Sequence, residues 1–161
     1  MIATRLVRRP IDVGALAAAV ASPAHGATAL FVGTVRDVND GRAVCGLDYS
    51  AYEAMAEREL AAIGGEAAAR FGVPALLVEH RLGTLGLGDV SVGIAAAHAH
   101  RVPALDAVRY VIEELKRRVP VWKQEHYVDG TREWVDPSRT SGDQRPAPGA
   151  PPAAAPSRVA S

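Results

Sequence analysis

The strongest constraint on how this chain can fold is an alternation of strand-like stretches with two long stretches of helical periodicity. Residues 53–71 carry apolar side chains along one helical face, and residues 103–119 do the same. Proline is favoured near a helix start and cannot continue a helix, so Pro103 and Pro120 mark the limits of the second helix. The two predicted apolar stripes consist of Met55, Leu60, Ile63 and Ala67, and of Leu105, Val108, Ile112, Leu115 and Val119. Two long helices interspersed with strands predict an α+β fold with a mostly antiparallel sheet.

The other predicted elements are shorter. A helix over 13–21 is expected to begin at Asp12, a good N-cap residue. Strands are expected over residues 4–8, 27–36, 44–52, 75–82, 90–99 and 121–128. Turn-forming residues predict loops over 37–42 and 83–88, and the strands over 27–36 and 44–52 are expected to pair as a hairpin.

The length of 161 residues and a hydrophobic content of 48% suit one domain with a sizeable core. We expect this domain to span residues 1–137. Residues 138–161 contain five Pro, six Ala and four Ser with no large apolar side chain beyond Val159, which predicts a disordered tail.

Charge and cysteine content exclude several classes of protein. The 18 basic and 18 acidic residues balance, so no overall positive field favours nucleic acid or an anionic membrane. No apolar run reaches the roughly 20 residues that cross a bilayer, and the N-terminus lacks a secretory signal pattern. A single cysteine, Cys45, excludes an internal disulfide and a multi-cysteine metal site. These features predict a cytoplasmic protein.

Lysine is rare and clustered in this chain. Only Lys116 and Lys123 are lysines, whereas the other 16 basic residues are arginines. Arginine can replace lysine wherever only a positive charge is needed, but not where an amine must lose its proton. On the predicted helix, Lys116 falls at the edge of the apolar face, where partial desolvation favours a neutral amine. Alternatively, both are surface lysines that interact with the helix dipole.

The predicted strand after Pro120 gives the second lysine an acidic neighbour. Because alternate residues of a strand share a face, Lys123 and Glu125 point the same way, and Trp122 and Gln124 point the other way. A second cation near Lys116 would favour its neutral form further.

Three further residues are candidate anion ligands. His100 and Arg101 precede the second long helix, whose N-terminal N–H groups can bind anions. Alternatively, Arg101 pairs with an acid such as Asp106 and His100 merely ends a strand. Arg36 ends a buried strand, where an arginine can reach into a cleft or simply be solvated.

Other candidate groups carry less information. His98 and His100 could share a strand face, but no third metal ligand is evident, so no metal site is predicted. His80 and His126 have no visible partner, and Cys45 is expected to be a small buried residue. No dinucleotide, Walker or nucleophile-elbow motif occurs, so no cofactor is predicted.

These residues together resemble a known family, the large catalytic subunits of molybdopterin synthase. The segment LK…P-x-WK-x-E with an upstream His-Arg pair is highly specific for that family. The resemblance covers nearly all of residues 27–135, in family order. The matching stretches are FVGTVRDVNDGRAV (31–44), LDYSAYEAMAERELAAI (47–63), VEHRLGTLGLGD (78–89) and HRVPALDAVRYVIEELKRRVPVWKQE (100–125).

The resemblance implies an α/β-hammerhead type of α+β fold and a homodimer flanked by two small ubiquitin-like subunits. Each small subunit carries sulfur as a thiocarboxylate on its C-terminal glycine, and its tail enters a pocket of the large subunit. Two sulfurs pass in succession to cyclic pyranopterin monophosphate (precursor Z), giving the dithiolene of molybdopterin. The large subunit itself binds no molybdenum.

Carried onto this chain, the resemblance implies that Lys116 and Lys123 are the active-site lysines. It implies that Arg36, His100 and Arg101 bind substrate, and that the pocket wall includes Phe31, Thr34, Val35, Gln124 and Glu125. Four positions depart from the family pattern: Ser50, Asp89, His98 and Leu105. None of them removes a catalytic group, although His98 could alter the electrostatics of the pocket.

Two other functions remain open from the sequence. The chain could be a non-catalytic module that grips the tail of a ubiquitin-like partner, or an acyl- or phosphate-handling enzyme that kept the pocket and changed substrate. The pair of lysines in an otherwise lysine-free chain argues against the first of these.

Overall fold

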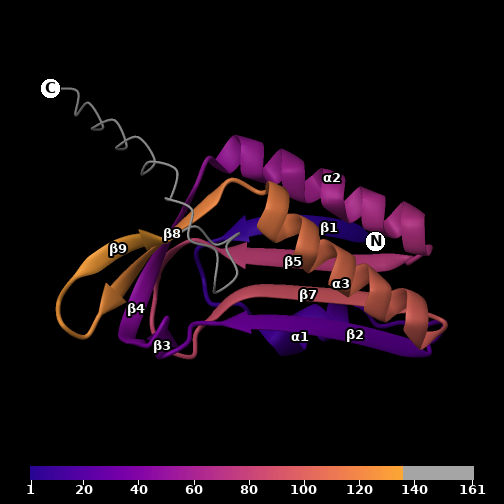
Figure 1. Cartoon of the computed structure of the whole chain (residues 1–161). Helices are drawn as coiled ribbons and strands as arrows, with labels where there is room; N and C mark the ends of the chain where they lie inside the picture. Colours follow the sequence, from indigo (N-terminus) through magenta and orange to yellow (C-terminus); the bar gives the residue numbers. More distant parts are fainter. Residues whose placement is uncertain (136–161) are drawn as a thin grey trace, which may run out of the picture.

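The computed structural model describes residues 1–135, which form nine strands and three helices (Figure 1). The predicted tail, 138–161, lies outside the described residues. In chain order the elements are β1 (Ile2–Val7), α1 (Val13–Val20), β2 (Ala27–Thr34), β3 (Val38–Asn39), β4 (Arg42–Ala51), α2 (Glu53–Phe71), β5 (Ala75–Arg81), β6 (Gly83–Leu85), β7 (Val90–His98), α3 (Arg101–Arg118), β8 (Val121–Tyr127) and β9 (Arg132–Val135).

The strands form two sheets. One has the order β1-β5-β7-β2, and the other has the order β3-β4-β8-β9 with β6 paired to β4. The β1–β5 pair is parallel, and all the other pairs among residues 1–135 are antiparallel. The predicted α+β class with mostly antiparallel pairing is confirmed.

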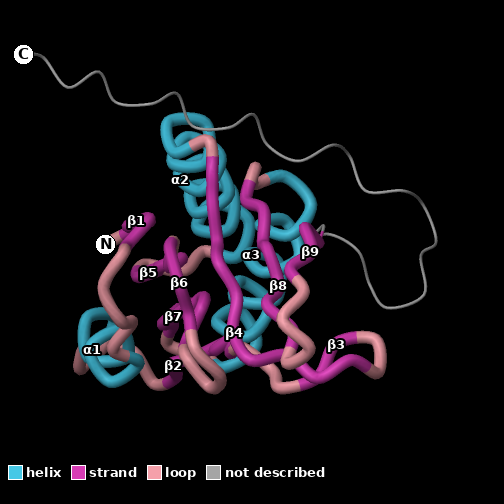
Figure 2. Tube along the Cα trace, turned by 90° about the vertical axis from the view of Figure 1, so that its left-hand side faces the viewer, coloured by secondary structure: helices cyan, strands magenta, loops and turns pink. Residues whose placement is uncertain are grey.

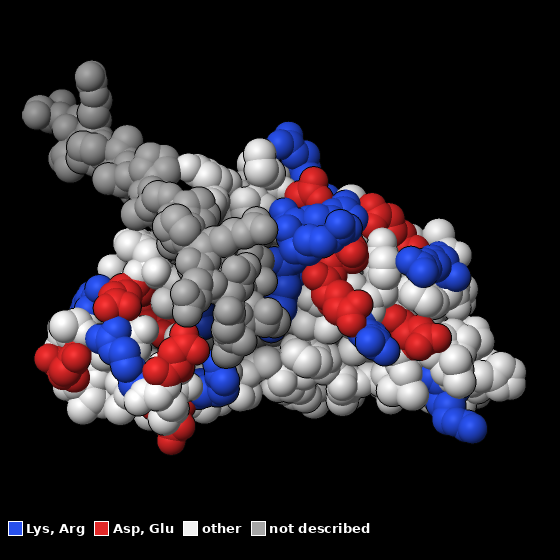
Figure 3. Space-filling view, viewed as in Figure 1, with Lys and Arg blue, Asp and Glu red and all other residues white. Residues whose placement is uncertain are grey.

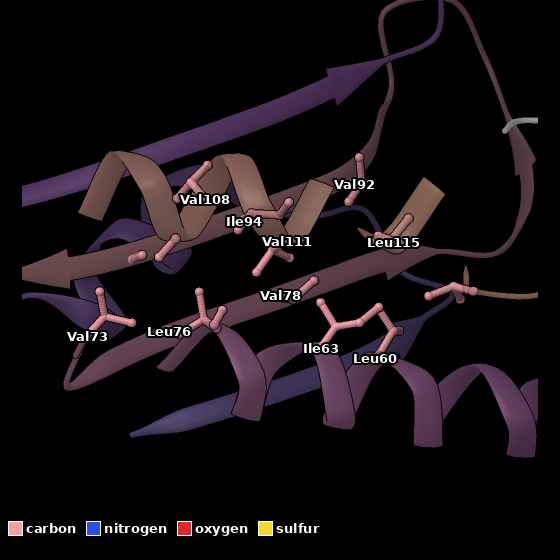
Figure 4. Packing of buried hydrophobic residues seen from close by; sticks show 14 of the residues in the cluster. Leu60, Ile63, Val73, Leu76, Val78, Val92, Ile94, Val108, Val111 and Leu115 are labelled. Atoms are coloured by element: carbon pink, nitrogen blue, oxygen red, sulfur yellow. The ribbon is translucent and has the colours of Figure 1, made fainter. Parts of the chain in front are cut away.

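The helices cover both faces of the first sheet. Helices α2 and α3 pack on one face and α1 on the other, as the two perpendicular views show (Figures 1 and 2). Because side chains alternate along a strand, β5 and β7 contribute apolar residues to the core on each face of the sheet. Leu76 and Ile94 face α2 and α3, whereas Leu77 and Ala95 face α1. Figure 4 shows the larger core, in which side chains of both long helices meet those of β5 and β7.

A network of ion pairs joins the two long helices on their outer side. Arg118, near the end of α3, hydrogen-bonds to Glu59 and Glu66 of α2 and to Glu114 of its own helix. Basic and acidic side chains therefore alternate over this face (Figure 3). In the part of the chain that the structure describes, no helix is long and apolar enough to cross a membrane.

The predicted hairpin between residues 27–36 and 44–52 is wrong. Strand β2 pairs with β7, and β4 pairs with β3, β6 and β8. The two predicted loops also contain strands. Val38–Asn39 forms a tight hairpin with β4 through Asp40 and Gly41, which both have positive φ, and Gly83–Leu85 pairs with β4.

The long helices differ in detail from the expectation. Helix α2 has the predicted limits, but Met55 is 49% exposed and Ala56 takes its place in the core. Helix α3 begins at Arg101, two residues before Pro103. Leu105 is 58% exposed, and the buried stripe of α3 runs through Ala104, Val108, Val111 and Leu115. The N-cap of α1 is confirmed, since the Asp12 carboxylate accepts a hydrogen bond from the Ala15 N–H at 2.9 Å.

Candidate functional site

A pocket of about 370 Å³ lies where the two sheets meet beside the C-terminal end of α3. Five strands and one helix contribute to its wall, which mixes apolar, aromatic and cationic side chains. Its lining consists of Phe31, Gly33 and Thr34 of β2 with Arg36 just after it, Tyr49 of β4, His80 of β5, Ser91 and Val92 of β7, Ile112, Leu115 and Lys116 of α3 with Val119 at its C-cap, and Val121 and Lys123 of β8. The volume is that of a small-molecule site.

The structure brings the two lysines to the same pocket. Lys116 lies in the last turn of α3, one residue after the buried Leu115, so its stem follows the apolar wall. Pro120 ends the helix and turns the chain into β8, which places Lys123 on the pocket side. In the isolated chain Lys116 is exposed, so the desolvation predicted from its helical position is not present before a ligand or partner covers it.

Glu125 holds the Lys123 ammonium in place, as the strand alternation predicts. The Lys123 Nζ lies 2.9 Å from Oε1 of Glu125, whose side chain is 4% exposed. The Asn39 amide and the Tyr127 hydroxyl each donate a hydrogen bond of 2.8 Å to the same carboxylate. Burial would raise the pKa of Glu125, but these donors outweigh it and the net pKa is lowered. Burial and the Glu125 carboxylate raise the pKa of Tyr127 to about 12.

Three residues predicted near the substrate line the pocket from the end of β2: Phe31, Thr34 and Arg36. The Arg36 side chain is exposed and reaches Asn39 at 3.4 Å, so it is linked through that amide to Glu125. Its guanidinium is therefore placed on the pocket rim, where it can meet an anion.

Three predicted wall residues, Val35, Gln124 and Glu125, do not line this pocket; Glu125 is buried and reaches it only through its contact with Lys123. Val35 is buried with Leu47 and Leu85 in a small separate core, because it points to the opposite side of the chain from Thr34. Gln124 lies between Lys123 and Glu125 on β8 and therefore faces away from them, as the sequence also indicated.

His100 and Arg101 are not joined to the lysines within one chain. They line a shallow recess with Gly26, Ala27 and Val102, at the opposite end of α3 from Lys116. Fifteen residues of helix separate Arg101 from Lys116, which is a distance of about 22 Å along the axis. His100 is the N-cap residue of α3, and its backbone N–H donates to Nδ1 of His98 at 2.9 Å.

Sequence reasoning missed three polar residues on the inner wall of the pocket: Tyr49, His80 and Ser91. His80 is 4% exposed, and burial lowers its pKa to about 4. Burial raises the pKa of Tyr49 and outweighs the lowering effect of the nearby Ser91 hydroxyl. The available signal was weak, because only the pairing of β4 with β6, the short strand that follows β5, brings Tyr49 against His80.

The remaining candidates stand apart from this pocket. Cys45 is exposed rather than buried, because it lies at an irregularity in the β4–β8 pairing between Val44 and Gly46. His126 pairs with Asp48 at 2.8 Å on the other face of that sheet. Within residues 1–135, no three His, Cys, Asp or Glu side chains are grouped so that they could hold a metal ion.

The site therefore combines an uncharged inner wall with a cationic rim. Two amines and one guanidinium can bind anionic groups at the opening, and a lysine amine can also donate a proton or act as a nucleophile. Aromatic and aliphatic side chains further inside suit a flat, largely uncharged body.

The fold and this pocket define an α+β protein that has a pocket of small-molecule size with a cationic rim between two sheets. The chain belongs to the MoaE protein family, whose family model matches residues 6–118. It is 46% identical over 150 residues to the molybdopterin synthase catalytic subunit of Oryza sativa subsp. indica, which covers 89% of this chain and 78% of the relative.

Solved structures show the same fold. Molybdopterin synthase from Staphylococcus aureus matches with a TM-score of 0.76 and 35% identity, over 81% of this chain and 94% of that one. A complex of subunits 1 and 2 of the molybdopterin-converting factor from Helicobacter pylori matches with a TM-score of 0.68 and 26% identity, over 82% of this chain and 89% of that one.

Proposed function

We propose that this chain is the catalytic subunit of a molybdopterin synthase. It is then a sulfurtransferase that moves sulfur from the C-terminal thiocarboxylate of a small ubiquitin-like subunit to cyclic pyranopterin monophosphate. The observation that carries the proposal is that the only two lysines of the chain line one pocket with Arg36. The family membership and the names of the relatives support it.

Within this reaction the two lysines have different tasks. Lys116, which is exposed at the pocket opening, acts closest to the thiocarboxylate. It acts as a proton donor, or as a transient amine nucleophile that forms a C–N bond to the acyl carbon while the C–S bond breaks and hydrosulfide leaves for the pterin; water then hydrolyses the amide and frees the lysine. Lys123, which Glu125 fixes at 2.9 Å, orients the substrate and adds positive charge beside Lys116. Arg36 provides a guanidinium for the phosphate.

The small subunit is the expected protein partner. The Helicobacter pylori relative was solved as a complex of two subunits of the molybdopterin-converting factor, which supports such a partner here. Its anionic tail would enter the pocket past the cationic rim. A single cysteine and balanced charge are typical of the cytoplasm, where we expect both proteins to act.

A homodimer would explain why His100 and Arg101 lie far from the lysines. Strand β2 is an edge of its sheet, and it exposes Leu30 and Val32. It runs from the recess of His100 and Arg101, beside Ala27, to the lysine pocket at Thr34. Two β2 strands paired antiparallel about a two-fold axis would therefore bring the recess of one copy to the pocket of the other.

Reconstitution tests the proposed reaction. The purified chain is incubated with a thiocarboxylated small subunit and cyclic pyranopterin monophosphate, and molybdopterin is measured. Product formation is the expected result. Binding of the small subunit without product would instead favour the non-catalytic tail-binding module, and no binding would favour an enzyme with a changed substrate.

Complementation between variants tests the shared site. Lys116→Ala and Arg101→Ala are each expected to be inactive alone, and their mixed dimers should regain activity, because one of the two sites then has both residues intact. Mixed dimers that stay inactive would show that the two residues do not act in one site across a dimer.

A further inference from the structure

His80 is a buried histidine on the inner wall of the pocket to which the proposed reaction assigns no task. It lies at the end of β5, is 4% exposed and still contributes to the pocket lining. Its ring packs edge-on against Tyr49, with centroids 5.0 Å apart and planes at 89°. Its place is therefore inside the pocket, whereas Arg36 and Lys116 are exposed at the opening.

The hydrogen bonds of His80 define which ring nitrogen carries the proton. Nδ1 lies 3.1 Å from the backbone carbonyl oxygen of Arg81. A carbonyl oxygen can only accept, so Nδ1 carries the hydrogen. Burial keeps the ring neutral at neutral pH, so Nε2 holds a free lone pair and is a hydrogen-bond acceptor.

No group in residues 1–135 donates a hydrogen bond to that Nε2. Within residues 1–135, Nε of Arg81 is the only fully buried side-chain nitrogen or oxygen without a partner, so Nε2 of His80 is open to the pocket rather than sealed in the core. An acceptor at the wall of a pocket is paired either with water or with a ligand. Because His80 lines the pocket, a ligand is positioned to supply the donor.

We propose that His80 is a specificity-determining residue that accepts a hydrogen bond from a ring N–H of the small-molecule substrate. The inference rests on the proposed function and identifies which part of the substrate binds deepest. Phe31 and Tyr49 offer aromatic surfaces and Val92 an aliphatic one beside His80, which suits a flat heterocycle. A pterin has such a ring with N–H donors, and its phosphate would remain at the cationic rim.

The thiocarboxylate tail is the less suitable occupant of this inner position. Its terminal sulfur and oxygen are acceptors, and an acceptor such as the bare Nε2 of His80 would repel them. The tail is matched by the ammonium groups of Lys116 and Lys123 at the opening.

The surroundings of His80 hold its ring in a fixed orientation. The Tyr49 ring packs edge-on against the imidazole, and the neighbouring Ser91 is fixed by the hydrogen bond that its Oγ donates to the backbone oxygen of Gly33 at 3.1 Å. Gly33 itself leaves room for this arrangement, since a Cβ there would lie 2.7 Å from Cγ1 of Val92. The acceptor is therefore pre-positioned, which limits the entropy lost on binding.

A matched pair of variants tests the proposal. His80→Phe removes the acceptor and keeps a flat ring, whereas His80→Gln retains a side-chain carbonyl acceptor; both lose the bond to Arg81. The KM for cyclic pyranopterin monophosphate is measured at saturating thiocarboxylated small subunit, and the KM for that subunit at saturating pterin. We expect His80→Phe to raise the pterin KM about tenfold and His80→Gln much less, with the subunit KM unchanged. An unchanged pterin KM in His80→Phe, or a rise in the subunit KM instead, would overturn the proposal.

Nitrogen NMR of the wild-type chain keeps the test decisive if His80→Phe does not fold. The Nε2 resonance of His80 should be that of an unprotonated ring nitrogen and should move on addition of the pterin, and a resonance that does not move would contradict the proposal. Failure of the proposed function is recognised separately, because the wild-type chain would then form no molybdopterin.

Discussion

The ammonium nitrogen of Lys123 lies 2.9 Å from a carboxylate oxygen of Glu125, two residues further along β8. Both side chains are largely buried, with 17% and 4% exposure. Asn39 and Tyr127 satisfy the second oxygen of the same carboxylate. The lysine is thus held by a carboxylate that is itself held by Asn39 of β3 and by Tyr127 of the same strand, β8.

Replacing Glu125 with glutamine should lower activity by disturbing Lys123 rather than by removing a reacting group. The amide keeps the volume of the side chain, but it loses the charge that fixes the ammonium, and its NH₂ group cannot accept from Asn39 or Tyr127. We expect kcat/KM for sulfur transfer to fall about tenfold, which corresponds to about 1.4 kcal/mol. The measurement is steady-state molybdopterin formation.

Glu133→Gln is the matched control for Glu125→Gln. Glu133 lies opposite Glu125 on β9, but its side chain is 55% exposed and pairs with Arg42 outside the pocket. Its replacement should leave kcat/KM within about twofold of wild type. Equal losses in the two variants would contradict the positioning role of Glu125.

Lys116→Arg should separate chemistry from charge at the pocket opening. Arginine keeps the positive charge, but it cannot lose a proton at neutral pH or act as an amine nucleophile. If Lys116 acts as proposed, kcat should fall about 100-fold or more. Arg117→Lys is the control, because Arg117 is the next residue, is 71% exposed and lies outside the pocket lining. Full activity of Lys116→Arg would leave Lys116 an electrostatic role only.

The buried His80 should make stability depend on pH in a defined direction. Its pKa is lowered from 6.5 to about 4 in the folded chain, so between these values the unfolded chain binds more protons than the folded chain. Stability from this group is complete above pH 6.5 and falls as pH decreases, by about 2 kcal/mol between pH 7 and pH 5. The other titratable groups that line the pocket are Tyr49, Lys116, Lys123 and Arg36.

Urea unfolding at both pH values, for wild type and His80→Gln, measures this contribution. The wild-type chain should lose about 2 kcal/mol more than the variant between pH 7 and pH 5. Parallel losses in the two proteins would show that His80 does not carry the effect.

The sequence predicted those parts of the fold that depend on local patterns. The limits of α2, the N-cap at Asp12 and the shared face of Lys123 and Glu125 follow from periodicity and capping, which operate within a few residues. The partner of β4 was predicted wrongly, because strand pairing is decided by contacts distant in sequence, here with β8 about 75 residues away.

The functional site likewise has a part that local sequence patterns predicted and a part that depends on contacts distant in sequence. Lys116 and Lys123 are close in sequence, and the turn at Pro120 is enough to bring both to one pocket. Tyr49, His80 and Ser91 come from three strands of two sheets, so nothing in their spacing indicates that they meet. Leu105 fits the predicted helical stripe but is exposed. The face of α3 that packs on the sheet carries Ala104 and Val108, and Leu105 lies just outside that face.

Two glycines should respond in opposite ways to alanine. Gly65 lies on the exposed side of α2 with no atom within 4 Å of an added Cβ, so Gly65→Ala should stabilise the chain by about 0.5–1 kcal/mol through helix propensity. Gly93 of β7 faces α1, where an added Cβ would overlap Cδ1 of Leu16 and lie 3.2 Å from Cγ2 of Ile11. Gly93→Ala should therefore destabilise the chain by about 1–3 kcal/mol, because α1 must move to admit the methyl group. Urea unfolding of both variants beside the wild type measures the two effects, and changes of the same sign would contradict the packing of α1 against β7.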